Sequence, residues 1–279
     1  MAKITQYASA TRFDANDVLL KDGTNGTKII TAKNAAIEFA GLVSITNRKN
    51  TVRGKDLGTS ITSAQRQAIA NATFDDMFIG DYWTVNNRRY YIADMDYWRG
   101  TGSYGEGADI NVLTTHHLVL IPSVSLCTGS MNSTDTTEGG YKGSTMYNSG
   151  LFGAVGTIRS DFGDMILPIK EYLINEVTDG EPSAAVWTVC DAVLMNEVML
   201  YGHQALASGG VSPASFTIDR KQLALFRMNA NVAIQYRGIW LRDVAGVRSF
   251  CAYSAYGYPT FANASSTKGV LPVFAICGE

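Results

Sequence analysis

The pattern of apolar and polar positions changes along the chain, and each change predicts an element of secondary structure. Near the N-terminus, the apolar residues 18–20 and 29–30 flank a stretch rich in Gly and Asn, which predicts a β-hairpin. Apolar residues then recur at helical spacing from Ala32 to Val43, so we expect a helix there, capped by Thr31. One hairpin and one helix bury too little surface to fold alone. Residues 1–45 are therefore expected to form a small module that packs on the rest of the chain or on another subunit.

The pattern from residue 46 onward predicts a larger domain that mixes helices and strands. Residues 46–60 are polar and contain glycine, which is typical of a connector. Thr62 and Gln65 form a capping box, so a helix is expected to begin there and to end near residue 72. Residues 81–85 and 88–92 predict a hairpin that turns at two asparagines.

Later segments carry weaker signals. Residues 117–121 are an apolar run that ends before Pro122, which indicates a buried strand. Residues 123–145 are rich in Ser, Thr and Gly and predict a loop. Short helices are expected at residues 146–161 and 192–200, and short strands with turns after residue 240.

Composition and charge exclude several classes of protein. The chain has 279 residues, of which 46% are hydrophobic and 17% charged, so it can bury a core. Its net charge is -2 and its 23 basic residues are scattered, which argues against a nucleic-acid partner. No apolar run approaches the roughly 20 residues that a membrane-spanning helix needs. Residues 1–10 have no signal-peptide pattern, so we expect synthesis in the cytoplasm and no membrane insertion.

Catalytic signals are sparse, and we expect no enzyme activity, no cofactor and no metal. On a strand, the adjacent His116 and His117 would point to opposite faces, which disfavours a shared metal site. Asp94 and Asp96 could share one strand face and bind calcium, but structural hydrogen bonding is the commoner role of such a pair. The glycine-rich residues 100–107 lack the lysine of a phosphate-binding loop. The four cysteines are far apart, so free thiols are expected rather than disulfides.

The most informative segment lies near the C-terminus. Residues 240–244 and 269–276 are aromatic, β-branched and apolar, as core strands are. Between them, residues 249–266 carry no charge and combine Tyr and Phe with Ser, Asn, Ala and Gly. Tyr offers a large amphipathic contact area and Ser and Asn offer adaptable hydrogen bonds, which is typical of a binding surface. The alternative is an ordinary aromatic-rich strand pair inside a β-sandwich.

A strand through this segment would divide its side chains between two faces. Ser254, Tyr256, Tyr258 and Thr260 would share one face. The full set that we predict to be exposed and to contact a ligand is Ser249, Cys251, Tyr253, Ser254, Tyr256, Tyr258, Thr260, Phe261, Asn263 and Ser265.

The frame around this segment resembles a known group of proteins. Trp-Leu-Arg-Asp-Val at 240–244, the Tyr/Ser/Ala/Asn-rich stretch and Gly-Val-x-Pro-x-Phe-x-Ile at 269–276 resemble the C-terminus of C-type-lectin-fold phage proteins. That group includes the variable proteins of diversity-generating retroelements and phage tropism determinants. Residues 17–23, 74–83, 116–122 and 195–197 are also similar to gut-phage tail proteins of this kind. The sequence departs from the family at Leu271, where the family usually has Arg.

The resemblance implies a specific organisation. It implies an α+β C-type-lectin-like domain over residues 46–279, with mixed, mostly antiparallel sheets and a variable-type segment at about 248–268. Residues 1–45 would be the anchoring or oligomerisation module that contacts phage tail proteins. The protein would be a virion component of the tail tip or fibre. It would also be a homotrimer, because receptor-binding proteins of this kind are commonly homotrimers. Its partner would be a protein or glycan on the host surface.

The codon chemistry of such retroelements offers a further sign. Mutation at template adenines turns AAC or AAT codons into many residues but never into Lys, Glu, Gln, Met or Trp. Residues 249–266 contain none of these five, which supports diversification.

Three alternatives remain at the level of sequence. The chain could be a structural tail or baseplate subunit that binds only virion proteins. It could be a glycan-degrading enzyme, which would need paired carboxylates in one cleft. Sulfatase-activating formylglycine-generating enzymes share the C-type-lectin-like architecture, but neither Cys251 nor Cys277 matches their cysteine sites.

Overall fold

The chain divides into two compact units, Met1–Thr46 and Asn47–Glu279, and this division falls beside the boundary expected from the sequence. A computed structural model describes residues 18–21, 28–31, 48–103, 112–211, 216–217, 221–233 and 238–278. In the first unit, β1 (Val18–Lys21) and β2 (Lys28–Thr31) pair antiparallel, which confirms the expected strand pairing. Residues 32–43, where a helix is expected, lie outside the described part of the chain.

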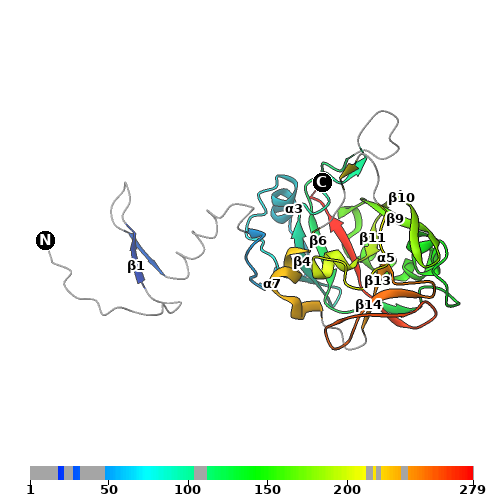
Figure 1. Cartoon of the computed structure of the whole chain (residues 1–279). Helices are drawn as coiled ribbons and strands as arrows, with labels where there is room; N and C mark the ends of the chain where they lie inside the picture. The colour runs from blue at the N-terminus through cyan, green and yellow to red at the C-terminus, as the bar shows by residue number, and fades with distance from the viewer. Residues whose placement is uncertain are drawn as a thin grey trace. The chain divides into compact units, whose positions relative to one another are not determined.

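The second unit consists mostly of β-sheets with a few short helices, so the predicted α+β class is confirmed (Figure 1). Its largest sheet has six strands in the order β11-β17-β6-β4-β3, with β8 paired to β17. These strands are β3 (Tyr82–Val85), β4 (Arg88–Met95), β6 (Leu118–Pro122), β8 (Ile166–Leu167), β11 (Ala192–Leu194) and β17 (Pro272–Ile276).

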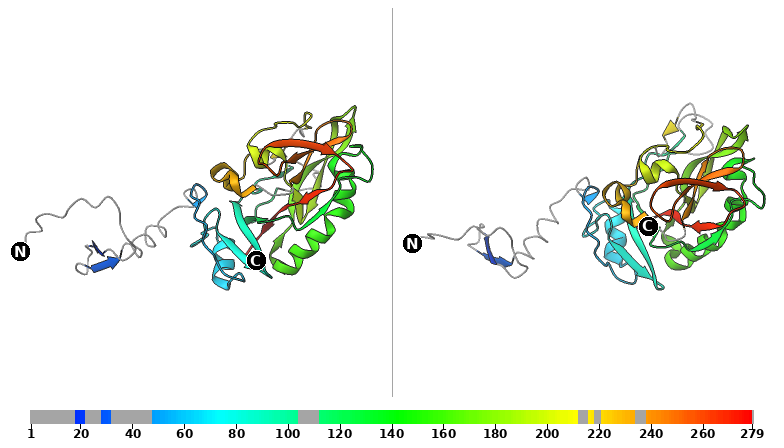
Figure 2. Two further views of the ribbon diagram at one scale, coloured as in Figure 1. Left: turned by 90° about the horizontal axis from the view of Figure 1, so that it is seen from below. Right: turned by 60° about the horizontal axis from the view of Figure 1, so that its bottom comes forward.

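Two strands of this sheet are buried along their whole length. All five residues of β6 are buried, as its apolar run predicts, and so are all five of β17. The α5 helix (Phe152–Phe162) runs beside β17 (Figure 2), and the rings of Phe162 and Phe274 lie 5.3 Å apart between centroids. The C-terminal strand therefore belongs to the hydrophobic core.

The hairpin of β3 and β4 forms as its turn residues predict. Asn86 and Asn87 have positive φ angles of 47° and 63°, which Asn tolerates better than most residues. Two central residues with positive φ twist the turn in the sense that matches two paired strands. The register Val85↔Arg88 confirms the predicted two-residue connection.

A second sheet of five strands, in the order β15-β14-β13-β16-β7, contains the C-terminal segment of interest. Its strands are β7 (Cys127–Gly129), β13 (Ile239–Val244), β14 (Ser249–Tyr253), β15 (Pro259–Asn263) and β16 (Lys268–Val270). The loop predicted over residues 123–145 is wrong in part. It contains β7 and the short helix α4 (Gly140–Gly143), because pairing with β16 supplies a strand that composition alone does not indicate.

The predicted helices meet three different outcomes. The helix α3 (Ser63–Ala70) begins at Thr62, and the Thr62–Gln65 capping box is present. The helix predicted over 146–161 is confirmed as the π-helical turn η1 (Met146–Gly150) followed by α5. The helix predicted over 192–200 is wrong in its first half, where pairing with β17 makes residues 192–194 the strand β11. The helix α6 (Glu197–Tyr201) follows, capped by the side chain of Asn196.

A long hairpin and several short elements complete the second unit, and the sequence did not predict the hairpin. β9 (Ile169–Thr178) and β10 (Glu181–Cys190) are ten residues long each and pair antiparallel. No helix in the described part of the chain is long and apolar enough to cross a membrane. The remaining elements are β5 (Gly102–Ser103), β12 (Phe216–Thr217), η2 (Gly163–Met165), α7 (Ala224–Met228) and η3 (Ala230–Ala233).

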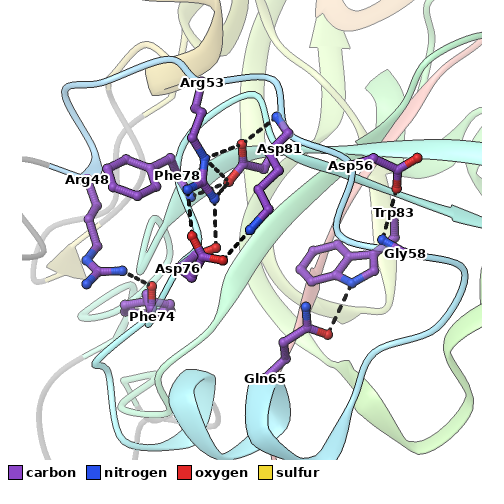
Figure 3. A network of polar contacts seen from close by, with 11 residues as sticks. Arg48, Arg53, Asp56, Gly58, Gln65, Phe74, Asp76, Phe78, Asp81 and Trp83 are labelled. Atoms are coloured by element: carbon purple, nitrogen blue, oxygen red, sulfur yellow. Dashed lines mark hydrogen bonds and ion pairs between the residues drawn. The ribbon is translucent and has the colours of Figure 1, made fainter. Parts of the chain in front are cut away.

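The polar stretch predicted to be a connector is instead bound to the large sheet (Figure 3). Arg53 donates hydrogen bonds to the buried carboxylate of Asp81, at 2.6 Å from Nη2, and to Asp76 at 2.6 Å from Nη1. Its guanidinium also lies 4.5 Å from the centroid of the Phe78 ring. Asp81 accepts a further bond from the backbone N–H of Lys55 at 2.8 Å. These contacts make residues 52–58 part of the folded domain, because a buried carboxylate requires such partners.

Candidate functional site

The segment of residues 249–266 forms a hairpin at one edge of the five-stranded sheet. β14 lies between β13 and β15, and β15 has β14 as its one strand neighbour in the described chain. Residues 254–258 make the turn, in which Ser254 N–H donates to the carbonyl of Tyr258 at 2.9 Å. Gly257 has a φ of 90° in this turn, a conformation that glycine adopts without strain.

Three aromatic side chains project from this hairpin into solvent. Tyr256 is 85% exposed, Phe261 59% and Tyr258 53%. The two tyrosine rings are nearly parallel, with an interplanar angle of 8° and 6.5 Å between centroids. Exposed aromatics grouped on one hairpin are unusual in a soluble domain and mark a candidate contact surface. We call Tyr256, Tyr258 and Phe261 the aromatic patch.

Polar residues beside the aromatic patch are held in place by a carboxylate from a distant loop. Asp135 accepts hydrogen bonds from Asn263 Nδ2 at 2.9 Å and from the hydroxyl and backbone N–H of Ser265, the latter at 3.1 Å. The hydroxyl of Ser265, followed by its N–H, lowers the pKa of Asp135, so the carboxylate stays ionised. Sequence analysis missed Asp135, because it lies 128 residues from Asn263 along the chain in a polar loop.

The prediction that all ten residues are exposed is wrong for three of them. Cys251, Tyr253 and Ser254 are buried, with exposed fractions of 0%, 4% and 8%. Four consecutive residues of β14, Phe250–Tyr253, are buried, so both faces of this strand are covered, and the ring of Tyr253 packs at 5.8 Å from that of Tyr201. Burial also raises the pKa of the Cys251 thiol, so Cys251 belongs to the core.

The other seven predicted residues reach the surface to different degrees. Asn263 and Ser265 are exposed together with the aromatic patch, whereas Ser249 and Thr260 are half-buried. The expected single strand face through 254–260 is wrong, because the turn interrupts the strand between β14 and β15.

The five-stranded sheet that carries the aromatic patch has a base of buried, hydrogen-bonded side chains around β13. Trp240 of β13 is fully buried, and its indole N–H donates to the carbonyl of Gly129 at 2.8 Å. Arg242 Nη2 donates to Glu171 Oε2 at 2.9 Å, and Trp98 Nε1 donates to Glu171 Oε1 at 2.7 Å. Both carboxylate oxygens of Glu171 are therefore engaged in structural contacts. A ligand that binds the aromatic patch would contact a surface whose backbone is already ordered before binding.

A cleft of about 360 Å³ lies next to this base and is a second candidate site. Glu171, Arg242 and Asp243 line it, together with parts of the β9–β10 hairpin and residues 202–211. Burial raises the pKa of Asp243 from 3.8 to about 6, although Asp243 accepts a hydrogen bond of 2.5 Å from the backbone N–H of Glu197. Two acidic residues share this cleft, but Glu171 is already paired, which argues against the two-carboxylate arrangement of a glycosidase.

Asp243 gives a pH-dependent stability that can be measured. Its pKa is higher in the folded protein than its ordinary value, so between about pH 4 and pH 6 the folded state binds a proton that the unfolded state releases. Its contribution to stability is therefore largest below pH 4 and falls as the pH rises to 6. We expect the variant Asp243→Asn to lose this slope, measured as the difference in urea-unfolding free energy from the wild type at each pH. Parallel curves for the two proteins would contradict the assignment.

The remaining candidate residues have structural roles. Asp94 accepts a hydrogen bond from the backbone N–H of Ala224 at 3.1 Å and pairs with Lys49 at 3.2 Å. His117 is buried and its Nε2 accepts from the backbone N–H of Trp98 at 3.1 Å, while the half-buried His116 contacts Asp96 at 2.8 Å.

Neither metals nor disulfides are indicated by the residues that the structure describes. They contain no group of three or more His, Cys, Asp or Glu side chains suited to a metal ion. All four cysteines are free thiols, as predicted. The glycine-rich residues 104–107 lie outside the described part of the chain.

Comparisons with protein-family models, with curated proteins and with solved structures found no match to this chain. Functional inference therefore depends on the residues and their geometry.

Proposed function

We propose that this chain is a receptor-binding protein of a phage tail, and that it recognises a protein or glycan on the host surface through the aromatic patch and its polar neighbours. The observation that supports this most is the exposure of Tyr256, Tyr258 and Phe261 on a hairpin whose base is buried. Aromatic side chains provide binding energy when a partner covers them, and the side chains of residues 249–266, none of which is charged, carry little desolvation penalty. The fixed base lets surface residues vary without unfolding the domain.

The proposal includes the wider organisation that the sequence resemblance implies. Residues 46–279 would be a C-type-lectin-like domain, and residues 1–45 would attach it to other tail proteins and to sibling chains, as a homotrimer. Several weak sites displayed together would then act with high avidity. The location would be the tip or fibre of the virion tail, after synthesis in the host cytoplasm.

Binding of the purified, fluorescently labelled chain to bacterial cells tests the proposal. We expect saturable binding to the strains that the phage infects, and competition between the unlabelled chain and intact phage. Binding to isolated tail proteins with no binding to any susceptible strain would instead favour a structural subunit. Release of sugar from host cell-wall polysaccharide would favour an enzyme.

Diversification of the segment is tested at the locus that encodes it. A nearby reverse-transcriptase gene and a near-copy of the coding region for residues 249–266, differing at adenines, would support it. A locus with neither would indicate a fixed relative with the same frame.

A further inference from the structure

Among the described residues, no strand pairs with the outer edge of β15, which leaves a row of backbone hydrogen-bonding groups open there. β14 and β15 pair antiparallel with the register Cys251↔Phe261, and Ala264 N–H donates to the carbonyl of Arg248 at 2.8 Å. Hydrogen-bonded and non-bonded pairs alternate in such a ladder. Thr260 and Ala262 therefore bond to β14, and the backbone groups of Pro259, Phe261 and Asn263 point outward.

Two of the outward-facing residues each lack one open backbone group: Pro259 lacks a donor and Asn263 lacks a free acceptor. Proline has no N–H, so Pro259 offers its carbonyl alone. The carbonyl of Asn263 already accepts from the N–H of Ser266 at 2.9 Å, so Asn263 offers its N–H alone. Phe261 lies midway between them and offers both groups, because its carbonyl accepts a long bond of 3.4 Å from the hydroxyl of Thr260 and keeps its second lone pair. The row therefore presents an acceptor, then a donor and acceptor, then a donor.

We propose that a second copy of this chain pairs with this edge, antiparallel and with a two-fold axis at Phe261. The N–H and carbonyl of Phe261 would each bond to Phe261 of the other copy. Each Asn263 N–H would donate to the other copy's Pro259 carbonyl. The pairing uses every open group of the row. Pro259, which has no N–H to donate, lies opposite Asn263 of the other copy, whose carbonyl already accepts a bond from Ser266.

The side chains of β15 favour the same arrangement. Residues directly opposite in an antiparallel pair lie on the same face, so the two Phe261 rings, each 59% exposed, would cover one another. On the other face, Thr260 would lie opposite Ala262. β15 contains no charged residue, although soluble proteins commonly protect exposed edge strands with charges.

Charges near the edge do not oppose the pairing. Asp135 lies at the Asn263 end of the strand. An antiparallel two-fold arrangement places the two Asn263 residues four positions apart, about 14 Å along the strand. That separation exceeds the screening length of about 8 Å at physiological ionic strength. The two five-stranded sheets would join into one continuous sheet. If the proposed function holds, this joining would link chains of two trimers through Phe261 and leave the tyrosine pairs of both chains on one bivalent surface that contacts the ligand.

The mass of the assembled 279-residue chain in sedimentation tests the pairing. We expect the variant Phe261→Lys to halve the mass of the wild-type particle, because it places two ammonium groups across the axis and separates the two paired halves. The control Tyr256→Lys adds the same charge at an exposed position outside β15 and should keep the wild-type mass. Equal masses for the wild type and Phe261→Lys would overturn the proposal.

A backbone test separates the ladder from side-chain effects. The variant Asn263→Pro removes the outward N–H, which an edge strand tolerates, and thus two of the four expected hydrogen bonds. We expect its dissociation constant for pairing to rise at least about tenfold. The control Asn263→Ala keeps the N–H but loses the contact with Asp135, and it should pair as the wild type does. Equal dissociation constants for the two variants would contradict pairing through the backbone.

These outcomes are distinct from a failure of the proposed function. Loss of cell binding in a Tyr256 and Tyr258 variant leaves the particle mass unchanged. A halved mass for Phe261→Lys supports the pairing even where the wild type binds no cell.

Discussion

The double variant Tyr256→Ala/Tyr258→Ala is expected to lose binding to host cells while its melting temperature stays within about 2 °C of the wild type. Each tyrosine is more than half exposed, so its removal leaves no cavity in the core. Truncation of a central aromatic contact typically weakens binding by about 2 kcal/mol or more, which is roughly 30-fold for each residue. Flow cytometry of labelled protein on cells and differential scanning calorimetry measure the two effects.

Tyr253 provides the matched control for this prediction. It belongs to the same hairpin but is only 4% exposed, and its ring packs beside that of Tyr201. The variant Tyr253→Ala is expected to lose about 3 kcal/mol of stability, or roughly 6–12 °C in melting temperature. If the double variant at 256 and 258 unfolded as early as Tyr253→Ala, the exposed tyrosines would be part of the core.

The variant Arg242→Met is expected to destabilise the domain by about 3–5 kcal/mol and to lower its melting temperature by roughly 6–20 °C. Arg242 and Glu171 are buried, with exposed side-chain fractions of 8% and 1%, and their ion pair measures 2.9 Å. Removal of the guanidinium leaves the carboxylate of Glu171 buried without its charged partner, and the indole of Trp98 cannot replace that charge. Chemical denaturation with urea measures the loss.

The double variant Glu171→Leu/Arg242→Met separates the charge from the packing. Removal of both partners leaves no unpaired charge, so we expect it to be more stable than Arg242→Met alone. A double variant that is less stable than either single variant would show that the packing of the two side chains, and not their ion pair, controls the stability.

The candidate site could be predicted from composition only in part. The Tyr/Ser-rich stretch correctly indicates the exposed Tyr256, Tyr258 and Phe261. It fails at Cys251 and Tyr253, because composition cannot reveal that other parts of the fold cover both faces of β14. It also gives no sign of Asp135, whose role depends on a loop that folds back over more than a hundred residues.

Signals carried by neighbouring residues sufficed for the α3 cap at Thr62, the asparagine turn between β3 and β4, and the buried run of β6. Each of these depends on contacts within a few positions or on one apolar run, which the sequence displays directly. Tertiary structure decided which faces of β14 are covered, that residues 192–194 form a strand, and that β15 is an edge. These features depend on partners distant in sequence, and the free energy of burial against such partners outweighs the weak preferences of short segments.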